Sequence, residues 1–132
     1  GIHLCNVERN GDVVEMTSYA PLLCKDGYHN WNPDMIYFDN SEKIRLTESY
    51  KMQKMFGQHS GDTYIVSNLN LPAALKKYVG TSVVKVSKTG KTWLKVVNAL
   101  PRTLKLQVEA QGAGAGNKQV EVKARSAEVF EL

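Results

Sequence analysis

From residue 63 onward, apolar and polar side chains alternate with a period of two, and this pattern restricts the fold more than any other feature. Such alternation is typical of β-strands, because successive side chains on a strand point to opposite sides. The turn residues 87–91 separate two of these segments and predict a hairpin. Short strands with turns between them favour a β-sandwich. The expected strands are residues 64–66, 83–86, 93–97, 104–108, 120–124 and 127–132.

The first 60 residues have a mixed pattern. Residues 2–10 are expected to end a helix, with Asn10-Gly11 suited to a left-handed C-cap. The β-branched and apolar residues 13–20 predict a strand buried on both faces, which Pro21 ends. A loop is expected at 25–33 and a short strand at 35–38.

A further helix is expected between Thr47 and Gly57. The Thr47 side chain can cap the free N–H groups, and Glu48 suits the positive end of the helix dipole. The apolar stripe of this helix is spaced at i, i+3 and i+4 and consists of Met52, Met55 and Phe56. Residues 71–75 are too short to assign.

The 132 residues are enough for one domain with a hydrophobic core. Hydrophobic residues make up 42% and charged residues 23%, which is typical of a globular protein. No apolar run approaches the ~20 residues that a membrane-spanning helix needs. There is no signal-peptide pattern, and because residues 2–7 resemble the middle of an element, we expect the natural N-terminus to lie upstream.

The net charge of +4 conceals two unlike halves. Residues 1–60 carry six Lys or Arg against eight Asp or Glu, whereas residues 61–132 carry eleven against five. A basic half raises the question of nucleic-acid binding. However, its lysines occupy turns and alternating strand positions, where solvent-facing side chains are expected, and no RNP-like or helix-turn-helix pattern accompanies them. We therefore expect neither nucleic acid nor membrane as a partner.

The sequence contains no convincing metal, redox or phosphate site. Cys5 and Cys24 match neither a redox pair nor a zinc pattern, so we predict two buried free thiols. The three histidines share no helical face, and no ligand spacing matches a zinc site. The glycine-rich residues 112–116 precede a strand rather than a helix, which favours a hairpin loop over a phosphate-binding loop. No metal and no cofactor are expected.

Residues 29–34, His-Asn-Trp-Asn-Pro-Asp, are the most informative segment. They combine an aromatic face with several hydrogen-bonding groups, and binding sites hold sugars with such groups. The alternative is that Trp31 fills the core while Asn32-Pro33 only turns the chain. Residue types alone favour that alternative.

Four blocks of the sequence carry a family resemblance. Residues 7–22 read Val-Glu-Arg-Asn-Gly-Asp-Val-Val-Glu-Met-Thr-Ser-Tyr-Ala-Pro-Leu, and Trp-Asn-Pro-Asp follows at 31–34. Ser-Tyr-Lys-Met-Gln-Lys-Met-Phe at 49–56 precedes Gly-Asp-Thr, and Lys-Val-Val-Asn stands at 95–98. In this order the blocks resemble the α-L-arabinofuranosidases of glycoside hydrolase family fifty-one. The resemblance is dense over residues 4–66, recurs at 90–98 and is thin after Pro101.

The resemblance implies a larger enzyme with a (β/α)8 barrel and a β-sandwich. That enzyme would remove terminal L-arabinofuranosyl groups from arabinan or arabinoxylan with retention. Its two catalytic glutamates would lie upstream, so no catalytic residue is assigned here. Residues 13–20 would be the eighth barrel strand, and because barrel sites form at the C-terminal ends of strands, substrate-binding residues are expected at Tyr19, Trp31 and Asn32. Some family members carry glutamine where Pro21 stands, which puts a contact by that side chain in doubt.

Together these features predict a mainly β fold, a jelly-roll-like β-sandwich with an N-terminal barrel-end extension and one short helix. Residues 1–40 would belong to the end of the catalytic barrel and residues 41–132 to the C-terminal sandwich. The expected function is to buttress the barrel of an α-L-arabinofuranosidase. The alternative is an autonomous carbohydrate-binding module. The expected partners are an arabinose-containing saccharide and the upstream barrel; the compartment stays open, with secretion or the periplasm expected for the larger enzyme.

Overall fold

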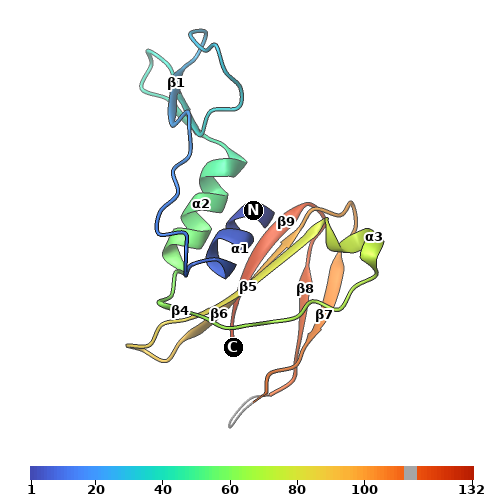
Figure 1. Cartoon of the computed structure of the whole chain (residues 1–132). Helices are drawn as coiled ribbons and strands as arrows, with labels where there is room; N and C mark the ends of the chain where they lie inside the picture. The colour runs from blue at the N-terminus through green and yellow to red at the C-terminus, as the bar shows by residue number, and fades with distance from the viewer. Residues whose placement is uncertain (112–115) are drawn as a thin grey trace.

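The computed structural model of the chain describes residues 1–111 and 116–132, in which there are three helices and nine strands. A larger β-rich body carries a smaller arm, and α2 joins the two (Figure 1). Among the described residues, no helix has the length and apolar character needed to cross a bilayer. Of the predicted glycine-rich loop at 112–116, residues 112–115 lie outside the described part.

A four-stranded antiparallel sheet with the order β4-β5-β6-β9 forms the centre of the body. Its strands are β4 (Thr63–Tyr64), β5 (Val79–Lys85), β6 (Thr92–Asn98) and β9 (Ser126–Glu131). β5 and β6 form the predicted hairpin, in which Val84 pairs with Trp93. A separate antiparallel pair consists of β7 (Leu104–Val108) and β8 (Lys118–Val122).

Side chains pack against both faces of the four-stranded sheet. One cluster joins β5 and β6 to β7 and β8; its buried members are Val79, Val83, Leu94, Val96, Leu100, Leu104 and Val122. The second cluster joins the sheet to α1 (Ile2–Arg9) and α2 (Glu48–Gln58); its buried members are Leu4, Cys5, Phe56 and Val97. The short α3 (Ala73–Lys76) precedes β5. Since both faces are covered, β5 and β6 are buried almost without interruption, as expected for central strands.

Helix α1 is also fixed to the sheet by a buried ionic network. The Nζ of Lys95 in β6 and the Oγ of Ser82 in β5 both donate hydrogen bonds to the carboxylate of Glu8. The Lys95 side chain is 0% exposed. A buried charge needs such a partner, because leaving water is otherwise strongly unfavourable. The network therefore holds the N-terminal helix on the sheet.

The arm contains a three-stranded sheet of β1 (Leu23–Lys25), β2 (Ile36–Phe38) and β3 (Ile44–Leu46). β1 pairs with β2 in parallel, and β2 pairs with β3 antiparallel. Thr47 connects this sheet to α2. Its hydroxyl donates to the carbonyl of Met35 (2.7 Å) and accepts the N–H of Tyr50 (3.4 Å), so the predicted N-cap is confirmed.

The expected strand at residues 13–20 is wrong for the described chain. Within it, Val13 and Met16 are exposed and only Val14 and Tyr19 are half-buried. A strand buried on both faces needs hydrogen-bonded neighbours and two covering layers. No described strand pairs with this segment. Its backbone instead turns after α1, where the N–H groups of Val13 and Val14 donate to the carbonyl of Asn10.

The mainly β character is confirmed in its coarse form: strands predominate, helices are few and several antiparallel pairings occur. The two expected helices are present as α1 and α2, and only the short α3 was not assigned from the sequence. Helix α1 does end at Asn10, but with φ −107° rather than in the predicted left-handed conformation. Helix α2 continues one residue beyond Gly57. β1 and β3 were not expected, because each has three residues including a cation, whereas β2 lies in the continuous apolar run 35–38.

Candidate functional site

Two of the three predicted substrate-binding residues lie in one loop of the arm. Trp31 and Asn32 lie in the connection between β1 and β2. Trp31 is 66% exposed, so it does not fill the core of the described chain. The interpretation of Trp31 as a core plug is therefore wrong for the chain as described. Its ring is accessible to a partner.

Asn32 is held by a buried tyrosine. The hydroxyl of Tyr37 in β2 donates to the Oδ1 of Asn32 (2.9 Å) and accepts the backbone N–H of Asp34 (3.0 Å). Tyr37 is buried, and the guanidinium of Arg45 lies over its ring at 4.3 Å from the centroid. Tyr37 thus holds the loop in place. The bond uses only the Asn32 carbonyl oxygen, so its NH2 group takes no part in it.

Tyr19 connects the loop to α2. Its hydroxyl lies 3.2 Å from the Oγ of Ser49 and 3.4 Å from the carbonyl of Pro33. Pro33 follows Asn32 directly, so Tyr19 contacts the loop that carries Asn32. The Tyr19 hydroxyl is used in hydrogen bonds within the chain, whereas the Trp31 ring is exposed. The two predicted residues therefore differ in what they can offer a sugar.

The burial of two residues at this loop, Asp34 and Tyr37, was not predicted. Asp34 is 2% exposed, and its Oδ2 has no hydrogen-bond partner among the described residues. Burial raises the pKa of the neighbouring Cys24 thiol, and the charge of Asp34 adds to this effect. Tyr37, which holds Asn32, was also missed. Residues 35–38 are all apolar or aromatic without alternation, so no pattern in the sequence indicates that Tyr37 faces this loop.

The loop presents an exposed aromatic ring and an amide. Aromatic rings and amides are groups that bind sugars by stacking and by hydrogen bonds. Within residues 1–111 and 116–132, no three His, Cys, Asp or Glu side chains gather in a way that could hold a metal ion. The predicted free thiols are confirmed, since Cys5 and Cys24 are both buried and unbridged.

Comparison with known proteins adds the family. The family model of the α-L-arabinofuranosidase C-terminal domain matches residues 1–129. The chain belongs to this family. It is the domain found in the α-L-arabinofuranosidases of glycoside hydrolase family fifty-one, as the resemblance implied.

Similar enzymes occur in plants and fungi. α-L-Arabinofuranosidase 2 of Arabidopsis thaliana is 35% identical over 111 residues, which cover 83% of this chain and 16% of that enzyme. A probable α-L-arabinofuranosidase A of Aspergillus flavus is 32% identical over 120 residues, 90% of this chain and 18% of that protein. The chain thus spans less than a fifth of the length of either relative.

A solved structure has the same fold. The arabinose-bound MgGH51 α-L-arabinofuranosidase superposes with a TM-score of 0.69 over 97% of this chain and 24% of that chain, at 24% identity. At this identity the superposition shows the shared fold of the C-terminal domain. The superposition covers the arm as well as the body.

Proposed function

We propose that this chain is the C-terminal part of an α-L-arabinofuranosidase that removes terminal α-L-arabinofuranosyl groups from arabinan or arabinoxylan. In that enzyme the body would be a jelly-roll-like sandwich that buttresses the catalytic barrel. Residues 1–40 would belong to the end of the barrel, and residues 41–132 to the sandwich. The length of the relatives supports this proposal, because the matched segment is a small share of each enzyme.

The exposed apolar residues around the arm carry the proposal. Six of them fall between α1 and β2: Val13, Met16, Leu22, Leu23, Tyr28 and Trp31. Met16 alone is 87% exposed. Apolar side chains that gather on a surface mark interaction sites, since their contact with water is unfavourable. The upstream barrel of the same enzyme is the partner that would cover them.

The chain itself would bind substrate but not cleave it. Retaining glycosidases need two carboxyl groups about 5–5.5 Å apart, one as nucleophile and one as acid and base. The family resemblance places both upstream. Within this chain, Glu8 is engaged by buried Lys95, and Glu48 pairs with Lys51 on the surface of α2. Trp31 would supply a stacking surface at the border of the barrel site, with Asn32 beside it.

An association experiment tests this proposal. The upstream part of the enzyme and this chain are produced separately and mixed, and complex formation is followed by size-exclusion chromatography. We expect a complex, and we expect M16D and L23D each to weaken it. V66D is the matched control, because Val66 is 83% exposed but lies beyond α2, outside the arm. Association that M16D and L23D leave unchanged would contradict the buttressing role.

The alternative is an autonomous carbohydrate-binding module, which the exposed rings of Trp31 and Tyr28 favour. In that case the isolated chain should bind an arabinan oligosaccharide without the upstream part. The same chromatography would then show no complex with the barrel. The two outcomes separate the candidate functions.

A further inference from the structure

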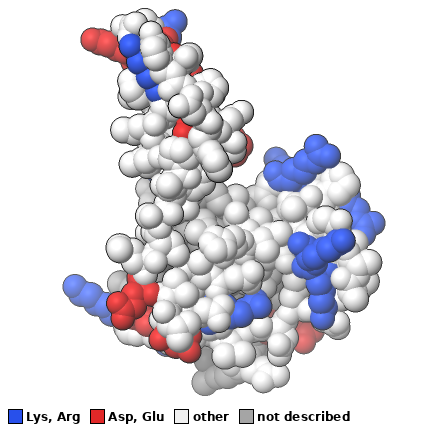
Figure 2. All heavy atoms as spheres, turned by 45° about the horizontal axis from the view of Figure 1, so that its top comes forward, with Lys and Arg blue, Asp and Glu red and all other residues white. Residues whose placement is uncertain are grey.

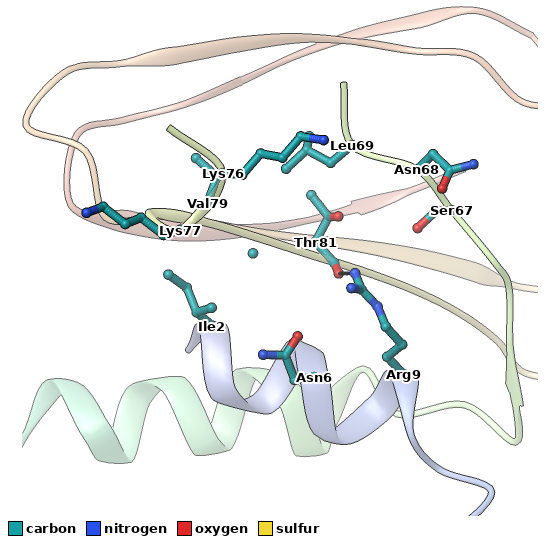
Figure 3. Close-up of a pocket in the computed structure, with 11 residues that line it drawn as sticks. Ile2, Asn6, Arg9, Ser67, Asn68, Leu69, Lys76, Lys77, Val79 and Thr81 are labelled. Atoms are coloured by element: carbon teal, nitrogen blue, oxygen red, sulfur yellow. Dashed lines mark hydrogen bonds between the residues drawn. The ribbon is translucent and has the colours of Figure 1, made fainter. Parts of the chain in front are cut away.

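A second feature of the body lies away from the Trp31 loop. A hollow of about 500 Å³ opens between α1, the segment before α3, and β5, within the roughly 300–1,000 Å³ of small-molecule sites. Figure 3 shows Asn6 and Arg9 on the α1 side, Ser67 and Asn68 on the adjoining segment, and Lys76 approaching from α3.

The lining of the hollow is polar and cationic. Arg9 donates to the carbonyl of Thr81 (3.4 Å) and to the hydroxyl of Tyr64 (3.2 Å), which fixes its guanidinium at the wall. The Oγ of Ser67 is buried and has no hydrogen-bond partner within the described chain. A buried hydroxyl without a partner is unfavourable, and a turn of the Ser67 side chain toward the hollow would let a ligand satisfy it. The hollow therefore has the groups for a polar ligand with a negative charge.

The surroundings add positive charge. Hydrogen bonds bring three turns together. The backbone N–H groups of Ala99 and Arg125 donate to the carbonyls of Tyr78 and Leu100. The side-chain amide of Asn98 donates to the carbonyls of Arg102 and Lys123. These turns and α3 carry exposed cations that form no ion pair with a described residue: Lys76, Lys77, Arg102, Lys123 and Arg125. We call these five residues the cationic end. Figure 2 shows Lys and Arg side chains gathered on the right-hand side of the body, where Figure 1 places α3.

We infer that the hollow and the cationic end form a binding site for an acidic oligosaccharide, with a uronate residue seated in the hollow. Arg9 and Lys76 would face its carboxylate, because guanidinium and ammonium groups bind carboxylates. Asn6, Asn68 and Ser67 would bond to its hydroxyls. The cationic end would hold further carboxylates of the same chain by long-range attraction.

The choice of a saccharide over another anion rests on the proposed function, since a polysaccharide-degrading enzyme meets sugar acids. The amide and hydroxyl groups of the hollow also favour a sugar over a bare ion. Nucleic acid would use the cationic end but needs no hydroxyl-binding hollow. These differences can be measured.

The test is a titration of the ¹⁵N-labelled chain followed by NMR. The ligands are trigalacturonate, its neutral methyl ester, inorganic phosphate, a short single-stranded oligodeoxynucleotide and neutral arabinotriose. We expect trigalacturonate to shift the amides of residues 67–69 and 76–81 in a saturable way. The methyl ester should bind at least tenfold more weakly, and phosphate and the oligonucleotide should give no saturable shift at residues 67–69.

Three variants sharpen this test. The double variant K76Q/K77Q should weaken trigalacturonate binding at least tenfold, whereas K88Q, in the turn between β5 and β6, should leave it unchanged. S67A should weaken it severalfold without lowering Tm, because it removes a hydroxyl that lacks a partner. Equal binding of phosphate or the oligonucleotide at residues 67–69, or equal losses in K88Q and K76Q/K77Q, would overturn the inference.

Arabinotriose separates this inference from the proposed function. Shifts at residues 29–34 with arabinotriose, together with no response of the hollow to trigalacturonate, would refute the acidic site and leave the role of the Trp31 loop standing. Shifts at the hollow with trigalacturonate, without shifts at residues 29–34 with arabinotriose, would support the acidic site. The role of the Trp31 loop would then be decided by kcat/KM of the larger enzyme.

Discussion

Glu8 in α1 and Lys95 in β6 form an ion pair across 87 residues of sequence, and the Lys95 side chain lies fully inside the protein over the ring of Phe56. The pair joins the two ends of the family resemblance, Glu-Arg-Asn near the N-terminus and Lys-Val-Val-Asn in β6. The mutual attraction of the two charges lets a polar pair lie between α1 and the sheet. Each charge is buried only because the other is present.

Breaking this pair should therefore be strongly destabilising. We expect E8L to lower the free energy of unfolding by about 3–5 kcal/mol, because it leaves the buried Lys95 without a counter-charge. The double variant E8L/K95M should recover most of this loss. Urea denaturation followed by circular dichroism measures both. The control E48Q breaks the exposed pair with Lys51 and should change stability by about 0.5 kcal/mol or less; a similar effect of E8L would contradict the buried role.

Asp62 should make stability depend on acid pH. The Ser87 hydroxyl (2.7 Å) and backbone N–H (3.1 Å) donate to its carboxylate and hold the pKa of Asp62 below its ordinary value. A carboxyl whose pKa is lower in the folded state stabilises the fold above its unfolded pKa, and this contribution disappears as pH falls through the folded value.

The measurement is the Tm difference between wild type and D62N at pH 7 and at pH 3. We expect D62N to melt lower at pH 7, and the difference to shrink at pH 3. D12N, which removes an exposed carboxylate elsewhere, should show no such change. A difference that is equal at both pH values would exclude the ionised Asp62 as its cause.

The two thiols should be present but slow to react. Burial raises the pKa of Cys5 to about 11 from 9.0, with the nearby charge of Glu8 adding to the effect. The thiolate is the reactive form, so its fraction at pH 8 falls about a hundredfold. A thiol reagent should count two thiols in the denatured, unreduced protein and react slowly with the folded one; a count of zero in the monomer would reveal a disulfide.

The raised pKa of Cys5 should make the free energy of unfolding fall at alkaline pH. Because the folded state keeps the Cys5 proton more tightly than the unfolded chain, stability is full below about pH 9 and declines toward about pH 11. The variant C5A should lose this dependence. Tm measured between pH 8 and pH 11 checks it, and an equal decline in C5A would assign the effect to other groups.

Trp31 should matter to the enzyme but not to the stability of the chain. Truncating a buried tryptophan costs about 3–5 kcal/mol, whereas Trp31 is mostly exposed. We expect W31A to leave the Tm of the chain nearly unchanged and to lower kcat/KM of the larger enzyme. Y78A, at an exposed aromatic residue of the body, is the control for the kinetics. A large loss of stability with unchanged kcat/KM would refute the binding role.

The body could be predicted from the sequence because its pattern is local. The alternation of β7 and β8 and the hairpin of β5 and β6 follow from side chains that are neighbours in the sequence. The arm could not be predicted as well. β1 and β3 have three residues each, and the burial of Tyr37 and Asp34 depends on contacts between distant segments.

Residues 13–20 show a second limit of sequence analysis. Their apolar, β-branched composition predicts a buried strand, but no described strand lies beside them. An apolar composition shows that a segment can be buried, but burial also requires a neighbouring element to pack against it. Lys95 is the converse case, because its alternating position suggested a solvent-facing side chain and the packing of α1 buries it.

Turnover of 4-nitrophenyl α-L-arabinofuranoside by the purified chain tests the central claim most directly. No carboxyl group of this chain has a catalytic role in the proposed function, and glycoside hydrolysis requires two. We therefore predict release of nitrophenol at the rate of the buffer alone, with the larger enzyme as the positive control. Turnover above that background, abolished by replacing one of the carboxylates of this chain, would contradict the account.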